Sequence, residues 1–198
     1  EWLPNRLEKQ ISYFNNPEVG LVYGNYYYKN EIKNSPKKIM FKYSLNSGDI
    51  FNSFIVNNDI HLLTVILRKK YLDAFEKKFD NNLQVIGDFD LFARFVKKYK
   101  AKAINDPIAL RRWHGNNESI TKIYIGIVEL IHWLDHHSRS DIILNKDEIN
   151  IIKLRIKHYQ LIQYKSEKKY KEYFKVFFQL SIIQQIIYVF KYFKNKIK

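Results

Sequence analysis

The pattern of apolar residues changes near residue 120, and this change constrains the fold more than any other feature. Before it, short β-branched and aromatic runs alternate with helical periodicities, which predicts an α/β domain over residues 1–119. After it, the helical period continues to the end and predicts three or four helices over residues 120–198, broken near 138–141 and 145–147. The sequence therefore divides into a mixed front part and an all-helical back part.

The elements of the front part follow from the spacing of its apolar residues and from its turn signals. Helical spacing predicts three helices, over residues 1–15, 68–78 and 87–99, and Asp49 is expected to cap a short fourth helix that ends at Phe54. Apolar runs predict strands over residues 19–23, 26–28, 39–43, 61–67, 101–104 and 107–113, the last two joined by a turn at Asn105-Asp106.

Positive charge is concentrated at the C-terminal end. The chain carries 34 Lys and Arg against 20 Asp and Glu, and residues 151–198 hold twelve of these cations and two Glu, a net +10 of the total +14. A basic end of this kind indicates an anionic partner, either nucleic acid or an acidic membrane surface, and its alternative is a solvated helix face.

Residues 173–198 favour the membrane among these partners. Apolar residues at helical spacing gather on one face and Lys and Gln on the other, in a stretch too short and too polar to span a bilayer. Such a helix is expected to lie in the interface of an anionic membrane. The alternative is a helix that packs on the domain or on a second copy of the chain.

The chain has no cysteine, which excludes disulfides and thiolate metal sites and favours a reduced compartment. It begins Glu1-Trp2 without an initiator Met, a signal peptide or an apolar run of transmembrane length. A truncated sequence is the simplest interpretation, and a processed terminus is the alternative.

Asp88 is the first candidate for chemistry, because it lies in the first turn of the helix predicted over residues 87–99. The free backbone N–H groups and the dipole of a helix start stabilise a carboxylate as the anion, which can accept a proton. Ordinary helix capping is the alternative reading.

The second candidate is the polar loop over residues 111–119, at the end of a predicted strand. Arg offers a planar fork of donors that matches phosphate, and His114 can donate to phosphate or bind a metal. Gly115 allows the backbone to approach a ligand closely. A surface turn is the alternative, and no second metal-ligand spacing supports His114 elsewhere in the sequence.

Five segments, in this order, resemble the second half of bacterial family-2 glycosyltransferases. Residues 2–7 (WLPNRL) resemble the helix after the acidic donor motif, and residues 19–23 (VGLVY) resemble the next core strand. Residues 63–69 (LTVILRK) resemble the acceptor-side strand. Residues 79–94 resemble the stretch FD…ED-(aromatic)-DL-x-x-R, and residues 107–119 resemble P-L-x-x-Y-R-x-H-G-x-N-x-S.

The resemblance implies a partial GT-A fold and an inverting transfer from a nucleotide-diphosphate sugar to a hydroxyl of a glycan or lipid-linked acceptor, in cell-surface polysaccharide synthesis. The position of Asp88 is that of the general base. By motif position, Arg112 and His114, with Trp113 beside them, are the groups that bind the donor diphosphate.

The resemblance also implies a divalent metal, Mg²⁺ or Mn²⁺, with His114 as a ligand within this chain. His61 and Thr64 fall where acceptor contacts are expected. The enzyme is expected in the cytoplasm, peripheral at the cytoplasmic face of the membrane. No nucleic acid is expected as a partner.

Three departures from the pattern affect activity. The Asp-x-Asp motif that would hold most of the metal would precede Trp2, Gly87 replaces the usual Glu before the base, and Lys78 replaces a common Gly. The chain alone is therefore expected to be an inactive fragment that lacks the nucleotide-binding half. A basic nucleic-acid-binding module and a non-catalytic assembly module are the competing interpretations.

Overall fold

The computed structural model describes residues 1–117, 121–136 and 142–185, and its contacts divide the chain into two units, residues 1–152 and 153–198. The first unit contains a mixed four-stranded sheet with helices, which confirms the predicted α/β class. The described part of the second unit is helical. The division lies within helix α7 (Lys146–Ser166), so α6 (Ile123–His136), the first helix after residue 120, belongs to the first unit.

Strand β1 (Val19–Asn30) is the centre of the sheet. Strand β4 (Lys100–Trp113) pairs with it in parallel along its whole length, while β3 (Ile66–Leu67) and β2 (Lys38–Ile39) pair with it antiparallel. Because β4 occupies one edge of β1 throughout, β3 and β2 share the other edge. The first eight residues of β1 are buried, as expected of a strand covered on both faces.

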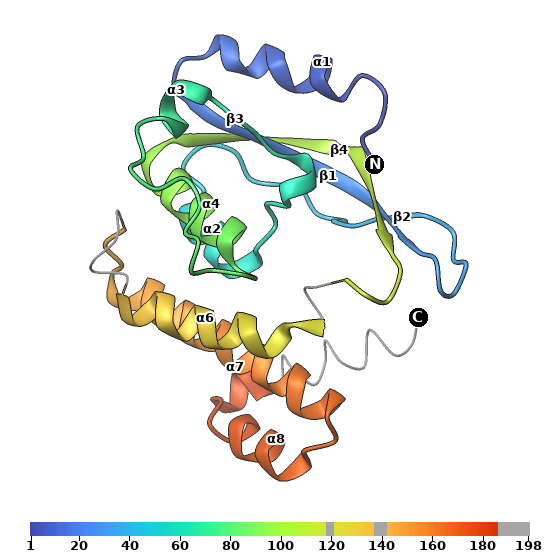
Figure 1. Cartoon of the computed structure of the whole chain (residues 1–198), viewed down its shortest axis with the longest axis vertical. Helices are drawn as coiled ribbons and strands as arrows, with labels where there is room; N and C mark the ends of the chain where they lie inside the picture. Colours follow the sequence, from blue (N-terminus) through green and yellow to red (C-terminus); the bar gives the residue numbers. More distant parts are fainter. Residues whose placement is uncertain (118–120, 137–141, 186–198) are drawn as a thin grey trace. The chain divides into compact units, whose positions relative to one another are not determined.

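Helices cover both faces of this sheet, as Figure 1 shows. Helix α1 (Arg6–Ile11), which a 3₁₀ turn continues through Asn15, lies on one face, where Phe14 packs on a cluster of Val19, Val22, Ile104 and Ile108. Helices α2 (Phe51–Asn57) and α4 (Gly87–Lys98) lie on the other face.

Aromatic contacts join the helices on the second face. Phe54 of α2 stacks on Phe89 of α4 with ring centroids 5.4 Å apart, and Trp133 of α6 meets the edge of Phe89 at 5.3 Å. Such pairs add to the stabilisation from apolar burial. Helix α6 is thereby fixed against α4.

The segment that follows β2 crosses this same face of the sheet. It leaves β2 at one edge of β1 and reaches the outer edge of β4, where Gly48 bridges to Ala101. Two asparagine side chains hold it: Asn25 bonds both backbone groups of Phe41, at 2.7 and 3.1 Å, and Asn105 accepts from the Leu45 N–H at 2.8 Å. The hydroxyl of Tyr23 donates to the Asn46 carbonyl at 2.9 Å.

Several predicted elements differ from the observed ones in length. The helix predicted from residue 1 begins only at Arg6, because Asn5 has a φ of 61° and residues 1–3 run along the outer edge of β4. The strand predicted over residues 61–67 is reduced to β3, because residues 62–64 form a 3₁₀ turn. The helix predicted over residues 68–78 is reduced to α3 (Lys69–Leu72).

Two further predictions are corrected by local structure. Asp49 does not cap α2, whose N-cap is Ile50 without a side-chain hydrogen bond. Residues 100–113 form one strand rather than two, and the expected turn at Asn105-Asp106 is absorbed as a β-bulge beside Asn25 of β1.

The second unit contains most of α7 and the amphipathic helix α8 (Tyr170–Phe177). Val176 and Leu180 pack on Leu161 of α7, with Tyr173 and Phe177 beside them. Among the described residues, no helix combines the length and the apolar character needed to cross a membrane. Residues 186–198 of the predicted amphipathic stretch lie outside the described residues.

Candidate functional site

Asp88 lies in the first turn of α4, half-buried. Its Oδ1 accepts the N–H of Phe89 at 2.8 Å. Burial raises the pKa of this carboxyl group, and the hydrogen bonds from the helix backbone oppose the rise only in part. Within the described residues no Lys or Arg forms an ion pair with Asp88, so its carboxylate is not committed to a cation of the fold.

Asp90, two residues further along the helix, is in contrast a structural residue. It is buried, its Oδ2 accepts from Arg94 at 2.7 and 3.1 Å, and its Oδ1 accepts from the Trp133 indole at 2.8 Å. Arg94 also donates to the carbonyls of Lys77 and Lys78. This network joins α4, α6 and the preceding loop, and it leaves Asp88 as the carboxylate at this helix start that can accept a proton.

A glutamate of α6 fixes the chain just before Asp88. The Glu129 carboxylate accepts three backbone N–H groups, from Gln84 at 2.6 Å, Val85 at 2.9 Å and Ile86 at 3.0 Å. The approach is close because residue 126 of α6 is glycine: a Cβ there would lie 3.2 Å from Val85. Glu129 therefore fixes the backbone that leads into α4, up to its N-cap residue Ile86, which makes no side-chain cap hydrogen bond of its own.

Replacing Glu129 by alanine should lower the free energy of unfolding by about 1.5–3 kcal/mol, because charge-assisted hydrogen bonds to partly buried N–H groups are lost. Asp135→Ala, on an exposed position of the same helix, is the control and should change stability by no more than about 0.5 kcal/mol. Urea unfolding of both variants measures the difference. Equal stabilities would show that the three hydrogen bonds contribute nothing net.

Successive side chains of β4 point to opposite faces of the sheet, and this alternation separates the side chains of the predicted phosphate-binding loop. Arg112 and His114 are exposed, whereas Arg111 and Trp113 are half-buried. Arg112 pairs with Glu1 at 3.2 Å and with Glu31 at 3.7 Å. Because Ile108 points to the α1 face, the period of two also puts Arg112 on that face and Arg111 on the α4 face.

The turn after β4 is held by its own residues. Gly115 has a φ of +86°, and the Asn117 side chain accepts the His114 N–H at 3.2 Å and donates to the Arg112 carbonyl at 3.4 Å. The Trp113 ring packs against Tyr28 with centroids 6.2 Å apart. In the described residues, no hydrogen bond or ion pair joins Asp88 to Arg112, Trp113 or His114, and Figure 1 shows α4 beside the first half of β4, away from this turn.

His61 and Thr64 take different positions. Thr64 is buried, and its hydroxyl donates to the His61 carbonyl while its own carbonyl accepts from Gln10. His61 is half-buried against Tyr26, with ring centroids 4.9 Å apart. Burial, and then the charge of Arg111, lower the pKa of His61 to about 4, so the ring is neutral at neutral pH.

Sequence reasoning missed the grouping of Arg111 and Tyr26 with His61. Arg111 hydrogen-bonds Tyr26, and this contact partly offsets the rise that burial causes in the pKa of the Tyr26 hydroxyl. The alternation of side chains along β4 is the signal that could have identified Arg111. The face to which Arg111 points depends, however, on the bulge near residue 105, which shifts this alternation.

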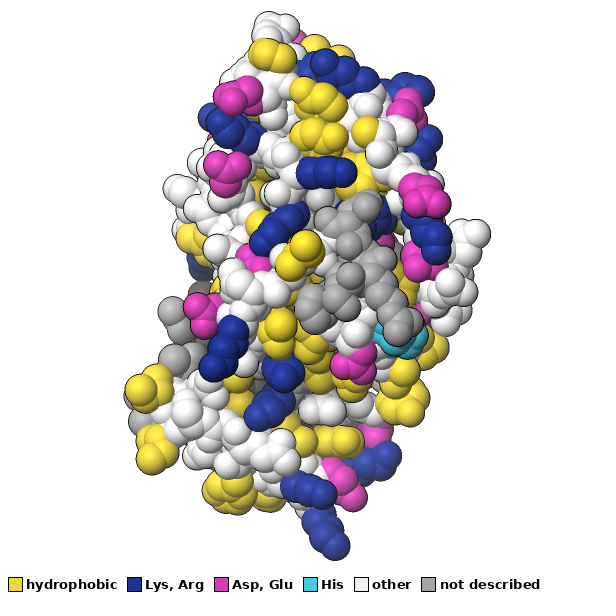
Figure 2. All heavy atoms as spheres, turned by 90° about the vertical axis from the view of Figure 1, so that its left-hand side faces the viewer, with side chains coloured by type: hydrophobic (Ala, Val, Ile, Leu, Met, Phe, Trp, Pro, Cys, Tyr) yellow, Lys and Arg dark blue, Asp and Glu magenta, His cyan; other side chains and the backbone are white. Residues whose placement is uncertain are grey.

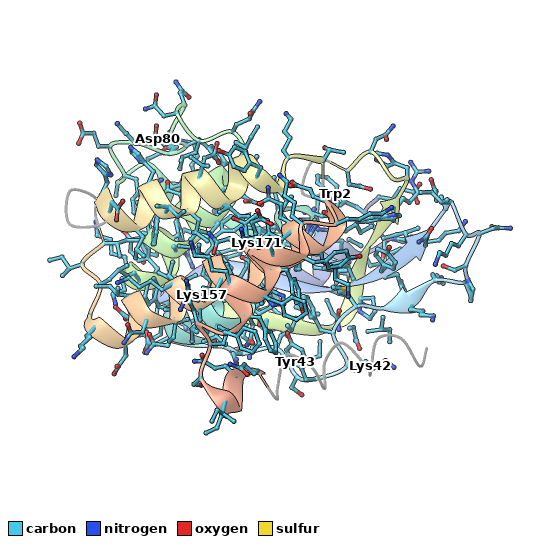
Figure 3. All side chains as sticks on the ribbon, turned by 90° about the horizontal axis from the view of Figure 1, so that it is seen from below. Trp2, Lys42, Tyr43, Asp80, Lys157 and Lys171 are labelled. Atoms are coloured by element: carbon cyan, nitrogen blue, oxygen red, sulfur yellow. The ribbon has the colours of Figure 1, made fainter. Side chains whose placement is uncertain are left out.

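An open cavity of about 540 Å³ lies under the segment that crosses the sheet. Its lining residues are Asn25, Ile39, Phe41, Lys42, Tyr43, Ser44 and Asn105. Phe41 contacts both Tyr26 and Tyr43, at centroid distances of 5.7 and 5.5 Å, so the cavity lies next to the His61 group. Figure 3 shows Lys42 and Tyr43 together, on the side away from Asp80.

The described residues do not by themselves form a metal centre, since no three of His, Asp and Glu gather among them. His114 has Asn117 as its side-chain neighbour, at 3.5 Å. A metal held at His114 would need its other ligands from outside the described chain.

The fold and this site define an α/β protein with a half-buried carboxylate at a helix start and an Arg-His-Tyr group beside a cavity. No protein-family model matches the chain, and the comparison with curated proteins found no match.

Proposed function

We propose that the chain is the acceptor-side part of an inverting, GT-A-type glycosyltransferase of cell-surface polysaccharide synthesis. The observation that carries the proposal is Asp88, a half-buried carboxylate with a raised pKa and without an ion-pair partner in the described residues. Asp90, two residues away, is in contrast bound in an ion pair with Arg94. The segments quoted for the family resemblance supply the reaction class.

In the proposed reaction, the acceptor hydroxyl gives its proton to Asp88 while its oxygen forms the new bond to the anomeric carbon of the donor sugar. The bond from that carbon to the diphosphate oxygen breaks, and the electron pair leaves with the diphosphate. The hydroxyl becomes acidic only as the new bond forms, so a carboxylate in position suffices as the base.

The divalent metal belongs to the proposal as a group held mainly by an upstream Asp-x-Asp motif, and when bound it would neutralise charge on the leaving diphosphate. His114 is the residue of this chain proposed to reach it, and Arg112 is proposed to act on the diphosphate. In the structure Arg112 is paired with Glu1 and Glu31, so that role requires at least one of these ion pairs to open.

The test is a sugar-transfer assay on the chain joined to the upstream, donor-binding portion that the resemblance implies. We expect transfer that requires a divalent metal and that falls by at least about a hundredfold in Asp88→Asn, the range for loss of a general base. Nucleotide-sugar binding should survive this change. An Asp88→Asn enzyme with full activity would exclude the assignment.

Peripheral attachment to the cytoplasmic face of the membrane is proposed for the second unit. Three apolar side chains spaced four residues apart are exposed on its C-terminal segment, Phe174 at 50%, Phe178 at 70% and Ile182 at 75%, opposite the row that packs on α7. The net charge of +10 over residues 151–198 complements anionic lipid headgroups.

The double variant Phe174→Ser/Phe178→Ser should bind vesicles of phosphatidylglycerol and phosphatidylcholine at least about tenfold more weakly, because each buried phenyl ring contributes roughly 1.5–3 kcal/mol. Phe79→Ser, at a similarly exposed phenylalanine of the first unit, is the control and should leave binding unchanged. Vesicle flotation measures both. Equal binding by all three proteins would remove this surface from the proposal.

Nucleic-acid binding receives no comparable support. On the face shown in Figure 2, Lys and Arg side chains of the described residues are interspersed with Asp and Glu. The aromatic residues of the first unit mainly pack on one another, as Phe54 does on Phe89 and Tyr71 on Tyr99. A shift assay with single-stranded RNA and DNA is therefore expected to give weak, salt-sensitive binding at most.

A further inference from the structure

We infer that His132 and His136 of α6 form a binding site for one divalent late transition-metal ion, of the class of Cu²⁺, Ni²⁺ and Zn²⁺. The inference goes beyond the proposed transferase function and does not rest on it. Imidazole is a ligand that these metals prefer, whereas Mg²⁺ takes oxygen ligands. Sequence reasoning found no second metal-ligand spacing and overlooked this pair, which lies outside the segments of the family resemblance.

The first argument is the spacing of the two side chains. His132 and His136 are four residues apart in α6, so they lie on the same side of the helix, one turn apart. Two histidines with this spacing on a helix supply two ligands to the metal ion of zinc metalloproteases. The two rings are adjacent, stacked with centroids 4.0 Å apart and an interplanar angle of 7°. One cation at about 2.1 Å from a nitrogen of each ring is therefore within reach of both side chains.

The second argument is the hydrogen bonding of the rings. Nδ1 of His136 lies 2.9 Å from the carbonyl oxygen of His132. A carbonyl oxygen can only accept, so this nitrogen carries the proton and, in the neutral ring, Nε2 has a free lone pair. Histidine ligands of metals are usually oriented in this way, by a bond from the other ring N–H to a carbonyl or carboxylate oxygen. Among the described residues, no hydrogen bond or ion pair occupies the ring nitrogens of His132.

The third argument is accessibility. Both histidines are exposed, so a metal ion can approach from solvent, and the parallel rings can turn toward a common point without displacing packed side chains. Because the described residues contain no group of three metal-binding side chains, they supply two ligands to this ion, and water or a small ligand fills the remaining positions. A mixed set of nitrogen and oxygen donors suits Cu²⁺ and Ni²⁺, and the general order of affinities places Cu²⁺ above Zn²⁺.

A metal ion in this site has a consequence for the stability of the fold. It links two residues one turn apart at the C-terminal end of α6, so it binds the folded helix more tightly than the unfolded chain. The same helix carries Glu129 and Trp133, which contact the backbone before α4 and the Asp90 carboxylate. Metal binding should therefore stabilise the contact between α6 and α4.

The test is calorimetric titration of the full, EDTA-treated chain with NiCl₂ and ZnCl₂. We expect a site for one ion, whose affinity falls at least about tenfold in His132→Ala and in His136→Ala, because losing a ligand costs no less than losing one of its supporting hydrogen bonds. The double variant should bind little more weakly than either single one, since both nitrogens are needed to chelate the ion. His158→Ala, at the exposed single histidine of α7, is the control and should bind as the wild type does.

Two further measurements separate this site from the metal of the proposed transferase and from unspecific binding. Excess Mg²⁺ should leave the Ni²⁺ titration unchanged, because Mg²⁺ does not compete for imidazole. Ni²⁺ at about a hundred times its dissociation constant should raise the melting temperature of the wild type and of His158→Ala by roughly 5–10 °C, and should have little effect on the two other single variants. A wild-type chain that binds neither ion, or an affinity that survives in His132→Ala and His136→Ala, would overturn the inference. Equal losses in His158→Ala would overturn it as well.

Discussion

Replacing Arg94 by alanine should lower the free energy of unfolding by about 3–5 kcal/mol, the usual cost of removing one partner from a buried ion pair. The change removes two hydrogen bonds to Asp90 and two to the carbonyls of Lys77 and Lys78. Among the side chains described, it also leaves the buried Asp90 carboxylate with only the Trp133 indole as a donor, which does not compensate a full charge.

Lys69→Ala is the matched control. Lys69 and Asp73 form an ion pair with the same spacing of four residues, but the Lys69 side chain is 87% exposed. Exposed ion pairs contribute little to stability, so the melting temperature of this variant should be close to that of the wild type. Thermal unfolding followed by circular dichroism should show Arg94→Ala melting roughly 10 °C or more below the wild type. Similar melting of the two variants would show that the buried network does not stabilise the fold.

Asp88→Asn should have the opposite effect on stability while it abolishes transfer. Burial raises the pKa of Asp88 in the folded chain, so folding favours the protonated carboxyl group. The stability that this group contributes is complete below its unfolded pKa of about 3.9, and it is lost as the pH rises through the folded pKa. At pH 7–8 the wild-type chain therefore carries a buried charge that the asparagine variant lacks.

The asparagine variant should accordingly unfold at a higher urea concentration than the wild type at pH 8, and the gap should narrow as the pH falls toward 4. Asp90→Asn is the contrasting variant, because it leaves Arg94 without its anionic partner and should destabilise the chain at pH 8. A gain in stability together with a loss of sugar transfer is expected when a buried charge lowers the stability of the fold but is required for catalysis. A destabilised Asp88→Asn chain would indicate a structural carboxylate instead.

Helices and strands were predicted most accurately where a single element carries a strong local pattern of apolar residues. The helix expected over residues 87–99 is α4, because its buried phenylalanines repeat at helical spacing, and the strand expected over residues 19–23 is the start of β1. Asp88 was found by the same local reasoning, since a helix start is visible in the sequence. Predictions became less accurate where tertiary contacts shorten an element, as in residues 61–67 and 68–78.

Local patterns in the sequence were enough to predict the α/β class, the change to helix after residue 119, the basic C-terminal end and the carboxylate at the start of α4. Which arginine lies beside Tyr26 and His61 could not be predicted in this way, because a bulge in β4 sets the face to which every later side chain of the strand points. The folded structure also brings Glu129 of α6 to the backbone just before α4, a contact between residues more than 40 positions apart. Local periodicity specifies single elements, whereas the pairing of strands and the docking of helices depend on contacts that no local pattern contains.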